Sequence, residues 1–261
     1  MIDSHCHLDG PAFDGDRVAV LSRARGAGVS DLVVPGVEPA GWGGLLALAA
    51  SHPGVHAALG IHPQALPGLH PADDDRHLAD LETLLSGGGA VGVGECGLDG
   101  GIAAEGVPFE RQLAVLRGHL EIARRLGLPV ILHSLRAGDA LRTALERDGI
   151  PSAGVLHSFS GSAEQVPPLA GLGLHFSFAG PVTYPSARKP LAAARAVPSH
   201  RLLVETDAPD QTPWPHRGAR NEPAHLPLVL AALAKARGTT PGELDALTTT
   251  NARRLFRLPG P

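Results

Sequence analysis

Residues 109–133, with the sequence FERQLAVLRGHLEIARRLGLPVILH, contain the unit that decides the fold. Residues 109–126 have the apolar spacing of an amphipathic helix. Gly127 and Pro129 end that helix, and residues 129–133 form a short apolar run that finishes on a histidine. A helix, a glycine-proline break and a buried strand in this order indicate one repeat of a parallel α/β sheet.

The same alternation continues along the whole chain. The predicted strands span residues 2–7, 31–35, 55–60, 90–95, 129–133, 154–157, 175–178 and 202–205. The predicted helices span residues 16–27, 40–51, 77–85, 109–126, 135–148, 163–172, 186–197, 223–237 and 241–256, and residues 97–108 and 209–223 are predicted to be long loops. Eight such units in 261 residues predict a single TIM (β/α)8 barrel domain over residues 1–261, since this barrel needs about 250 residues.

Composition limits the kinds of protein that this chain can be. Hydrophobic residues make up 43% and charged residues 18%, which is typical of a packed soluble domain. No apolar run approaches the roughly 20 residues of a membrane span, and the first residues do not form a signal peptide, so we expect a cytoplasmic protein without a membrane partner. A net charge of −4 argues against broad electrostatic binding to nucleic acid.

Reactive side chains follow the predicted strands. Because the active site of a (β/α)8 barrel lies at the C-terminal ends of its strands, these residues are candidates for chemistry. They are His5, His7, His62, Glu95, His133, His157 and Asp207. Side chains alternate faces along a strand, so His5 and His7 point the same way and Cys6 points the other way.

Alternation also predicts a layer of packing beneath the reactive layer. It places Val93 on the face of Glu95, Ile131 on that of His133, Val155 on that of His157 and Glu205 on that of Asp207. Neutral imidazoles and carboxylates suit Zn, Mn, Fe, Ni or Co, and carboxylates with water suit Mg. A lone strand histidine is more often an ordinary core or surface residue, but coincidence at five strand ends is improbable, so we interpret the set as a metal site.

The remaining histidines and both cysteines have no such partners. His52, His56, His70, His77, His119, His175, His200, His216 and His225 are interpreted as ordinary residues. Cys6 and Cys96 are too few for a disulfide framework and have no C-x-x-C spacing, so both are interpreted as structural.

Several motifs together resemble the TatD family of metal-dependent deoxyribonucleases, within the amidohydrolase superfamily. They are Asp3-Ser-His-Cys-His-Leu-Asp9, Gly60-Ile-His-Pro63, Gly94-Glu-Cys-Gly-Leu-Asp99, Leu128-Pro-Val-Ile-Leu-His133, Val155-Leu-His-Ser-Phe-Ser-Gly161, Glu205-Thr-Asp-Ala-Pro209 and Arg220-Asn-Glu-Pro223. Asp210 and Phe13-Asp-Gly-Asp16 are similar to the YjjV-like branch of that family. The chain departs from the commoner pattern at Gly100, at Ser134-Leu135-Arg136, where an arginine usually follows the serine directly, and at Asp210. These departures put the substrate in question.

The resemblance implies two divalent ions, with Mg, Mn and Zn as the candidates. His5, His7 and Asp207 would hold one ion, His133 and His157 the other, and Glu95 would bridge them. Related enzymes bridge their ions with a carboxylated lysine, but Lys189 and Lys235 lie in predicted helices away from the strand ends, which leaves Glu95 as the bridge.

Paired ions activate water for hydrolysis, and Asp207 is the candidate general base, with Glu95 as its catalytic partner. His62 is a candidate contact to a phosphate oxygen, with support of a ligand or capping of the third strand as alternatives. Arg220 is a candidate phosphate clamp, whereas Arg217 is interpreted as part of a solvated loop.

Three residues are predicted to act around the site and not within it. We expect Glu205 to support a histidine ligand. We expect Asn221 to lie near an N-cap and Pro223 in the first turn of a helix.

The predicted reaction is cleavage of phosphodiester bonds at nucleic-acid ends. A carboxyl-esterase, lactonase or deacylase on the same scaffold is the main alternative, because neither fold nor ligands fix a substrate. A metal-binding protein without turnover is the alternative outside enzymes, and Asp207 argues against it.

Overall fold

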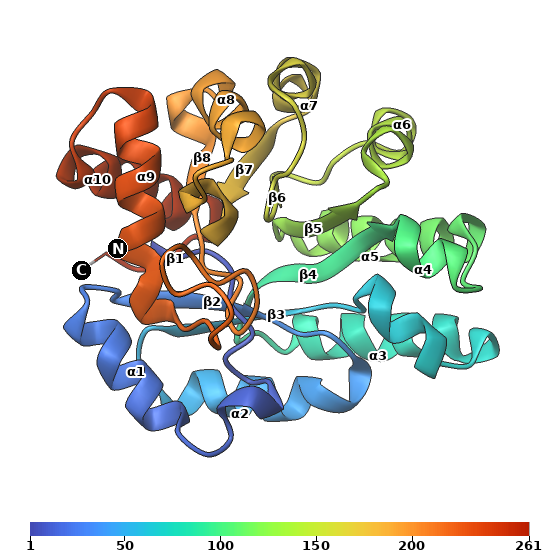
Figure 1. Ribbon diagram of the computed structural model, residues 1–261. Coiled ribbons are helices and arrows are strands. Elements are labelled where there is room, and N and C mark those ends of the chain that lie inside the picture. The colour runs from blue at the N-terminus through green and yellow to red at the C-terminus, as the bar shows by residue number, and fades with distance from the viewer. Residues whose placement is uncertain (261) are drawn as a thin grey trace.

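Eight parallel strands lie side by side in the order β1 to β8 in the computed structural model, which describes residues 1–260. They are β1 (Ile2–Asp3), β2 (Asp31–Pro35), β3 (Val55–Leu59), β4 (Ala90–Asp99), β5 (Val130–Leu135), β6 (Gly154–Leu156), β7 (Leu174–Phe178) and β8 (Leu202–Val204). The strands form a nearly closed barrel with helices outside it (Figure 1). The predicted TIM barrel is therefore confirmed.

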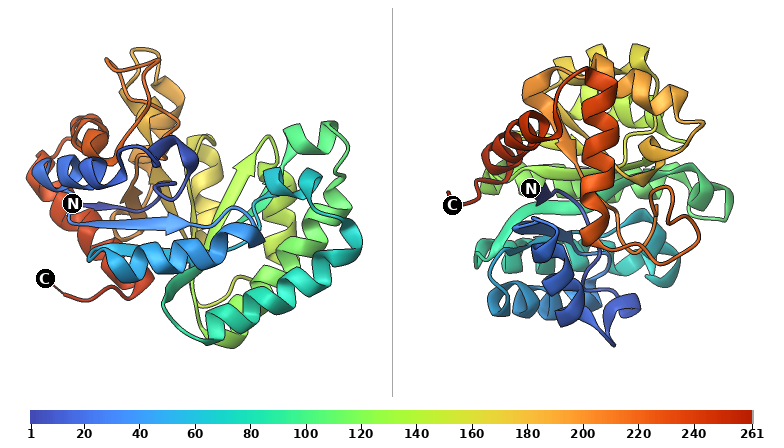
Figure 2. Two further views of the ribbon diagram at one scale, coloured as in Figure 1. Left: turned by 90° about the horizontal axis from the view of Figure 1, so that it is seen from below. Right: turned by 60° about the vertical axis from the view of Figure 1, so that its left-hand side comes forward.

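The helices alternate with the strands, as predicted. They are α1 (Arg17–Gly26), α2 (Trp42–Ser51), α3 (Asp74–Ser86), α4 (Gly100–Ala104), α5 (Phe109–Leu126), α6 (Gly138–Asp148), α7 (Val166–Gly171), α8 (Arg188–Ala196), α9 (Leu226–Arg237) and α10 (Pro241–Phe256). Figure 2 shows α9 and α10 on the side of the barrel where both termini lie. None of the helices in residues 1–260 combines the length and the apolar character that crossing a bilayer requires.

Short 3-10 helices occupy many of the connections. They are η1 (Pro11–Phe13), η2 (Pro39–Gly41), η3 (Pro63–Gly68), η4 (Pro71–Asp73), η5 (Ala163–Gln165), η6 (Gly180–Thr183), η7 (Ser199–Arg201) and η8 (Pro223–His225). The predicted helix at 223–237 is thus divided into η8 and α9, with Pro223 at its first position, as expected.

The first strand is shorter than predicted, because it ends at Asp3 and not at residue 7. Beyond that point the backbone alternates between two neighbours. The Ser4 amide donates to the Val204 carbonyl of β8 (3.1 Å), and the Cys6 amide donates to the Val33 carbonyl of β2 (3.1 Å). The Ser4 bond links this segment to β8 and the Cys6 bond links it to β2, so the segment that carries His5 and His7 closes the barrel instead of continuing a regular strand.

The fourth strand is longer than predicted, and the loop expected at residues 97–108 is wrong for residues 97–104, which belong to β4 and α4. A register shift between Val93 and Cys96 lets β4 continue to Asp99, which pairs with Leu135 of β5. Strand β5 consequently includes Leu135, where a helix was expected to begin. The Asp99 carboxylate then starts α4 by accepting a hydrogen bond from the Gly101 amide (2.7 Å), as an N-cap residue does.

Two apolar layers hold the barrel together. The interior cluster contains alternate strand residues, closed at the N-terminal ends of the strands by α10; its buried members are Ile2, Val33, Ala58, Ile131, Val155, Leu203, Ala252, Leu255, Phe256 and Leu258. Ile131 and Val155 therefore occupy the predicted layer. Val93 does not, because it packs in the outer cluster between sheet and helices; the shift after Val93 breaks the alternation that predicted its place.

The last long loop, between β8 and η8, lies in front of the strands in Figure 1. Buried Asn221 holds it in place, because its amide nitrogen donates to the carbonyls of Thr206 (2.8 Å) and Asp210 (2.7 Å). Glu222, not Asn221, is the N-cap residue of η8. Asn221 lies next to that position but acts by bracing the loop.

Candidate metal centre

The six predicted ligands come from five segments and meet at the C-terminal ends of the strands. They are His5, His7, Glu95, His133, His157 and Asp207, and all except His5 line a cavity of about 370 Å³. His5 is fully buried behind its neighbours, and Glu95 is fully buried as well. Burial of this many polar groups requires partners, since an unpaired buried polar group costs about 1–3 kcal/mol.

Four ligand atoms surround one position. His5 Nε2 lies 3.2 Å from His7 Nε2 and 3.1 Å from Glu95 Oε2. Asp207 Oδ1 lies 3.5 Å from His5 Nε2 and 3.8 Å from His7 Nε2. A tetrahedral ion with bonds of about 2.0–2.2 Å separates its ligand atoms by roughly 3.3–3.6 Å. The donor set fits one divalent ion.

A second group of atoms adjoins the first through the same carboxylate. Glu95 Oε1 lies 2.9 Å from His133 Nδ1 and 2.8 Å from His157 Nε2, and those two nitrogens are 3.2 Å apart. Glu95 thus presents one oxygen to each group. Glu95 Oε2 is buried without a hydrogen-bond partner in residues 1–260, so the protein alone leaves this ligand oxygen unsatisfied.

Carboxylates behind two of the imidazoles favour the ligand form of each ring. Glu205 Oε1 lies 3.6 Å from His157 Nδ1 and accepts a hydrogen bond from the Ser158 amide (2.5 Å). Asp99 Oδ2 lies 3.4 Å from His133 Nε2. Such partners direct a ring proton away from the metal side. Glu205 stands where its supporting role was predicted, whereas Asp99 was missed although it ends the motif that contains Glu95.

His62 also reaches the site, and its tautomer decides what it can do there. Its Nδ1 accepts a hydrogen bond from the Gln64 amide (3.0 Å), so in the neutral ring Nε2 carries the proton. Nε2 lies 2.8 Å from Glu95 Oε1 and 3.2 Å from His133 Nδ1. His62 is therefore a hydrogen-bond donor in the cavity as well as the residue that begins η3.

The pKa values of the two central carboxylates, Glu95 and Asp207, shift in opposite directions. Burial would raise the pKa of Glu95, but the charges of His157, His62 and His5 hold it well below its usual range. Burial raises the pKa of Asp207, and the nearby histidines offset this only in part. Glu95 is consequently the permanent anion, and Asp207 is the carboxylate better able to take up a proton.

The Asp207 carboxylate is oriented by residues that sequence reasoning did not identify. Gln211 donates to Asp207 Oδ2 through its amide nitrogen. The Gln211 amide in turn contacts the Ser158 hydroxyl at 2.6 and 2.8 Å. Both residues lie in irregular segments beyond strand ends, where no periodicity marks them.

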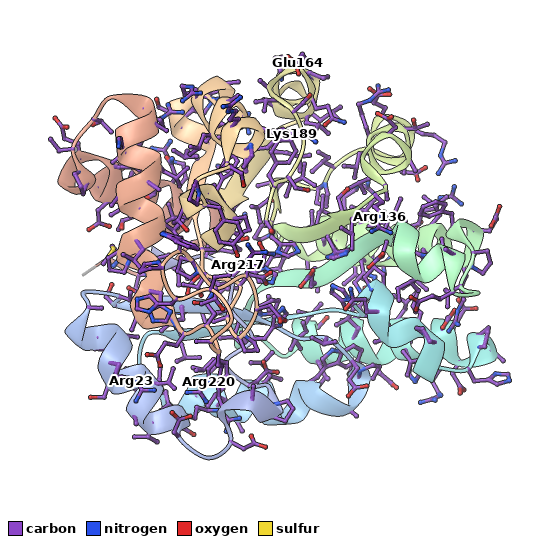
Figure 3. The ribbon with its side chains drawn as sticks, in the orientation of Figure 1. Arg23, Arg136, Glu164, Lys189, Arg217 and Arg220 are labelled. Carbon is purple, nitrogen blue, oxygen red and sulfur yellow. The ribbon has the colours of Figure 1, made fainter. Side chains whose placement is uncertain are left out.

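The structure does not bring Arg220 to the metal centre. Its guanidinium donates to both Asp16 oxygens at 2.8 Å and to the Ala12 carbonyl at 2.7 Å, and it lies 4.8 Å from the centre of the Phe13 ring. Figure 3 shows Arg220 beside the segments near the N-terminus, at the edge of the last loop. Arg220 thus fastens that loop to η1. Arg217 is exposed, with its guanidinium 5.1 Å from the centre of the Tyr184 ring.

Both cysteines are buried free thiols, and burial raises the pKa of each. Cys6 and Cys96 pack in the outer cluster, away from the ligand atoms. The arrangement leaves no thiolate for chemistry or metal binding.

Comparisons with known proteins agree with this geometry. Residues 2–257 match the family described as TatD related DNase. The chain is 39% identical over 260 residues to "Uncharacterized metal-dependent hydrolase YjjV" of Escherichia coli K12, covering 99% of this chain and 98% of that protein. It is 35% identical over 271 residues to "3'-5' ssDNA/RNA exonuclease TatD" of Edwardsiella piscicida, covering 99% and 100%.

Solved structures give the same relationship. The crystal structure of the E. coli K12 protein YjjV, described as a TatD homologue, has a TM-score of 0.92 and 38% identity over 99% of this chain and 98% of that one. An amidohydrolase from Saccharomyces cerevisiae, 20% identical with a TM-score of 0.82 over 97% of this chain and 99% of that one, shares the fold. The motifs, the barrel and these matches lead to one conclusion: the chain belongs to the TatD-related DNase family.

Proposed function

We propose that this protein is a divalent-metal-dependent hydrolase that cleaves phosphodiester bonds at nucleic-acid ends. The observation that carries the proposal is the Glu95 carboxylate, which presents Oε2 to His5 at 3.1 Å and Oε1 to His157 at 2.8 Å. A buried carboxylate between two imidazole groups is suited to holding two cations close together. Relatives named as exonucleases for single-stranded DNA and RNA support the choice of substrate.

The proposed ligands divide into two sets. His5, His7, Asp207 and Glu95 would hold one ion, and His133, His157 and Glu95 the other; Mg, Mn and Zn are compatible with this mixture of imidazoles and carboxylates. Bound ions of this kind would lower the pKa of a shared water and polarise a phosphoryl oxygen.

The chain's own groups complete the reaction. Asp207 takes up the proton of the attacking water, because burial raises the pKa of this carboxyl, and Gln211 orients it by donating to Oδ2. His62 donates from Nε2 to a phosphate oxygen, since Nδ1 is held as an acceptor by the Gln64 amide. Glu95 stays ionised throughout, because the surrounding histidines hold its pKa well below its usual range.

Charge and composition confine the substrate to the cavity. The net charge is −4 and aromatic residues are 3% of the chain, so neither a basic face nor a long stacking platform binds a strand. Two or three phosphate contacts would give a salt slope near −2, since each contributes roughly −0.7 for single strands. A flexible end enters such a cavity more easily than an internal segment.

The test compares linear and circular forms of one labelled single-stranded DNA, with an RNA and a panel of carboxyl esters as further substrates. Metal-replete protein should degrade the linear strand and spare the circle across a salt series. Equal cleavage of the circle would contradict the preference for ends. Hydrolysis of carboxyl esters without action on any phosphodiester would favour the esterase alternative, and metal binding without turnover of either would favour a binding protein.

A further inference from the structure

A second, smaller cavity opens beside the metal centre. Its volume is about 170 Å³, and it lies where β5 and β6 end, against α6, α7 and α8. Ser134, His157 and Ser160 line both cavities. Because His157 is a proposed metal ligand, a group bound in the smaller cavity would lie next to a group bound at the metals.

The lining of this cavity combines an apolar floor with two cations. Leu141, Leu156, Phe159 and Leu169 provide the apolar surface, and Arg136 and Lys189 provide the charge. The two cations come from different elements, Arg136 from the turn after β5 and Lys189 from the start of α8 (Figure 3). We call this site the cationic pocket.

Neither cation is used by the protein itself. Arg136 and Lys189 make no ion pair and no side-chain hydrogen bond with any residue in 1–260, whereas Arg111, Arg117 and Arg220 each bind a carboxylate. Two unpaired cations on one cavity attract an anion, and a guanidinium fork and an ammonium are both suited to phosphate.

The position of Arg136 is set by the backbone around it. Arg136 has φ of 51°, which is uncommon for a residue with a side chain. A Cβ atom at Gly100 would lie 2.8 Å from the Arg136 carbonyl oxygen and 3.1 Å from Arg136 Cβ. Any other residue at position 100 would displace Arg136, so the glycine there and the arginine at 136 depend on each other.

We propose that the cationic pocket binds the phosphate that adjoins the scissile phosphodiester, with Arg136 and Lys189 as its charged contacts. The inference rests on the proposed function. The apolar floor accommodates the sugar between the two phosphates, and the shared wall at His157 keeps the scissile group at the metals. The pocket would therefore select substrates with at least two phosphates over isolated diesters.

The experiment compares thymidylyl-thymidine with the same dinucleotide carrying a 5′- or a 3′-terminal phosphate, using metal-loaded enzyme. The wild type should show kcat/KM at least about tenfold higher for one of the phosphorylated forms, as one charge-assisted contact would give. In Arg136→Gln combined with Lys189→Gln, that ratio should fall toward one, mainly through KM. Arg195→Gln, an exposed arginine farther along α8, is the matched control and should keep the ratio.

The outcomes separate this inference from the proposed function. Cleavage of all three dinucleotides with equal efficiency, or with a ratio that survives the double substitution, would overturn the cationic pocket and leave the phosphodiesterase intact. If no dinucleotide is cleaved, the proposed function fails. Calorimetry of the phosphorylated dinucleotides with metal-loaded protein then decides the pocket alone: equal affinity in wild type and double variant rejects it.

Discussion

The two ends of the barrel treat buried polar groups in opposite ways. At the N-terminal end, Asp31 has a partner for each oxygen: His56 Nε2 lies 2.9 Å from Oδ1, and Ser30 donates to Oδ2 at 2.8 Å. At the C-terminal end, five histidines surround Glu95, and its Oε2 has no hydrogen-bond partner within residues 1–260. The protein itself supplies partners for the Asp31 carboxylate, whereas the Glu95 carboxylate needs a bound ligand to satisfy both of its oxygens.

The unsatisfied group at the C-terminal end lowers the stability of the metal-free protein. An unsatisfied buried group costs about 1–3 kcal/mol. In addition, neighbouring imidazole rings repel each other when both are protonated. A bound cation would satisfy Glu95 Oε2 and would be held by the imidazole nitrogens that face it, which must be unprotonated to act as ligands. Substitutions at the C-terminal end should therefore change how strongly metal stabilises the protein, and substitutions at the N-terminal end should not.

The largest effect should come from Glu95→Gln, which removes the carboxylate that both groups of ligands share. Metal content should fall, and hydrolysis should drop by at least about 10³-fold, since metal stabilisation of the transition state is worth several kcal/mol. Elemental analysis and initial rates measure both. If Glu95→Gln keeps close to two ions per chain, Glu95 does not bridge them. His133→Ala is the intermediate case, because it should lower the metal content without emptying the site.

Asp207→Asn should separate proton transfer from binding. Loss of a general base typically costs about 10²–10⁴-fold in rate, and the amide keeps the shape of the side chain. Turnover should fall far more than substrate affinity, measured by kcat against a direct binding constant. Near-normal turnover would show that Asp207 is not the base.

Removal of metal should destabilise the protein, and only substitutions at the C-terminal end should abolish this effect. Saturation of a site at 100 times its Kd stabilises a protein by about 2.7 kcal/mol, so a chelator should lower the Tm of the wild type. Glu95→Gln should lose most of this metal-dependent shift, and His56→Ala at the opposite end should retain it. Equal responses in the two variants would refute the contrast between the ends.

His119 provides a pH test of a histidine that is satisfied by the protein alone. Burial lowers its pKa to about 4 from 6.5, while its Nδ1 contacts the Val115 carbonyl and its Nε2 accepts from the Ile61 amide. Because the folded pKa is the lower one, the unfolded chain binds the extra proton. Stability is intact above about pH 6.5 and is lost as the pH falls toward 4, by up to about 3 kcal/mol.

Denaturant unfolding of metal-free protein across this pH range measures the effect. His119→Gln should be less stable at neutral pH, but its curve should be flatter by about 1.4 kcal/mol per pH unit. Parallel curves for the two proteins would mean that His119 does not titrate in this way.

The smallest effect should be that of His56→Ala. It removes one contact to Asp31, which keeps Ser30 and the nearby Arg253 as partners. A loss of about 1 kcal/mol in unfolding free energy is expected, with metal content and activity at wild-type values. Burial would raise the pKa of Asp31, but His56 and Ser30 hold it below its usual value. The stabilisation from the ionised Asp31 is therefore present above the pKa of a free aspartate and is lost as the pH falls below it.

Much of the site was predictable because the same sequence pattern marks both the strands of the barrel and the residues at their C-terminal ends. Each reactive residue lies near or just beyond the end of a strand, and parallel strands bring their C-terminal ends to one side of the barrel. Asp99, Ser158 and Gln211 were missed because they orient other side chains across the cavity. Arg220 was placed at the substrate from its loop position, but contacts to Asp16 took its charge elsewhere.

The order of the units, the alternation around His5 and His7, and the convergence of reactive residues follow from the sequence, because strand periodicity and helix ends are local properties. The tertiary structure alone decided how Glu95 serves two groups. The register shift between Val93 and Cys96 turns this carboxylate between histidines from four other segments, and it depends on pairing with neighbouring strands. The tautomer of His62 and the unpaired state of Arg136 likewise depend on contacts between distant residues, which no local pattern encodes.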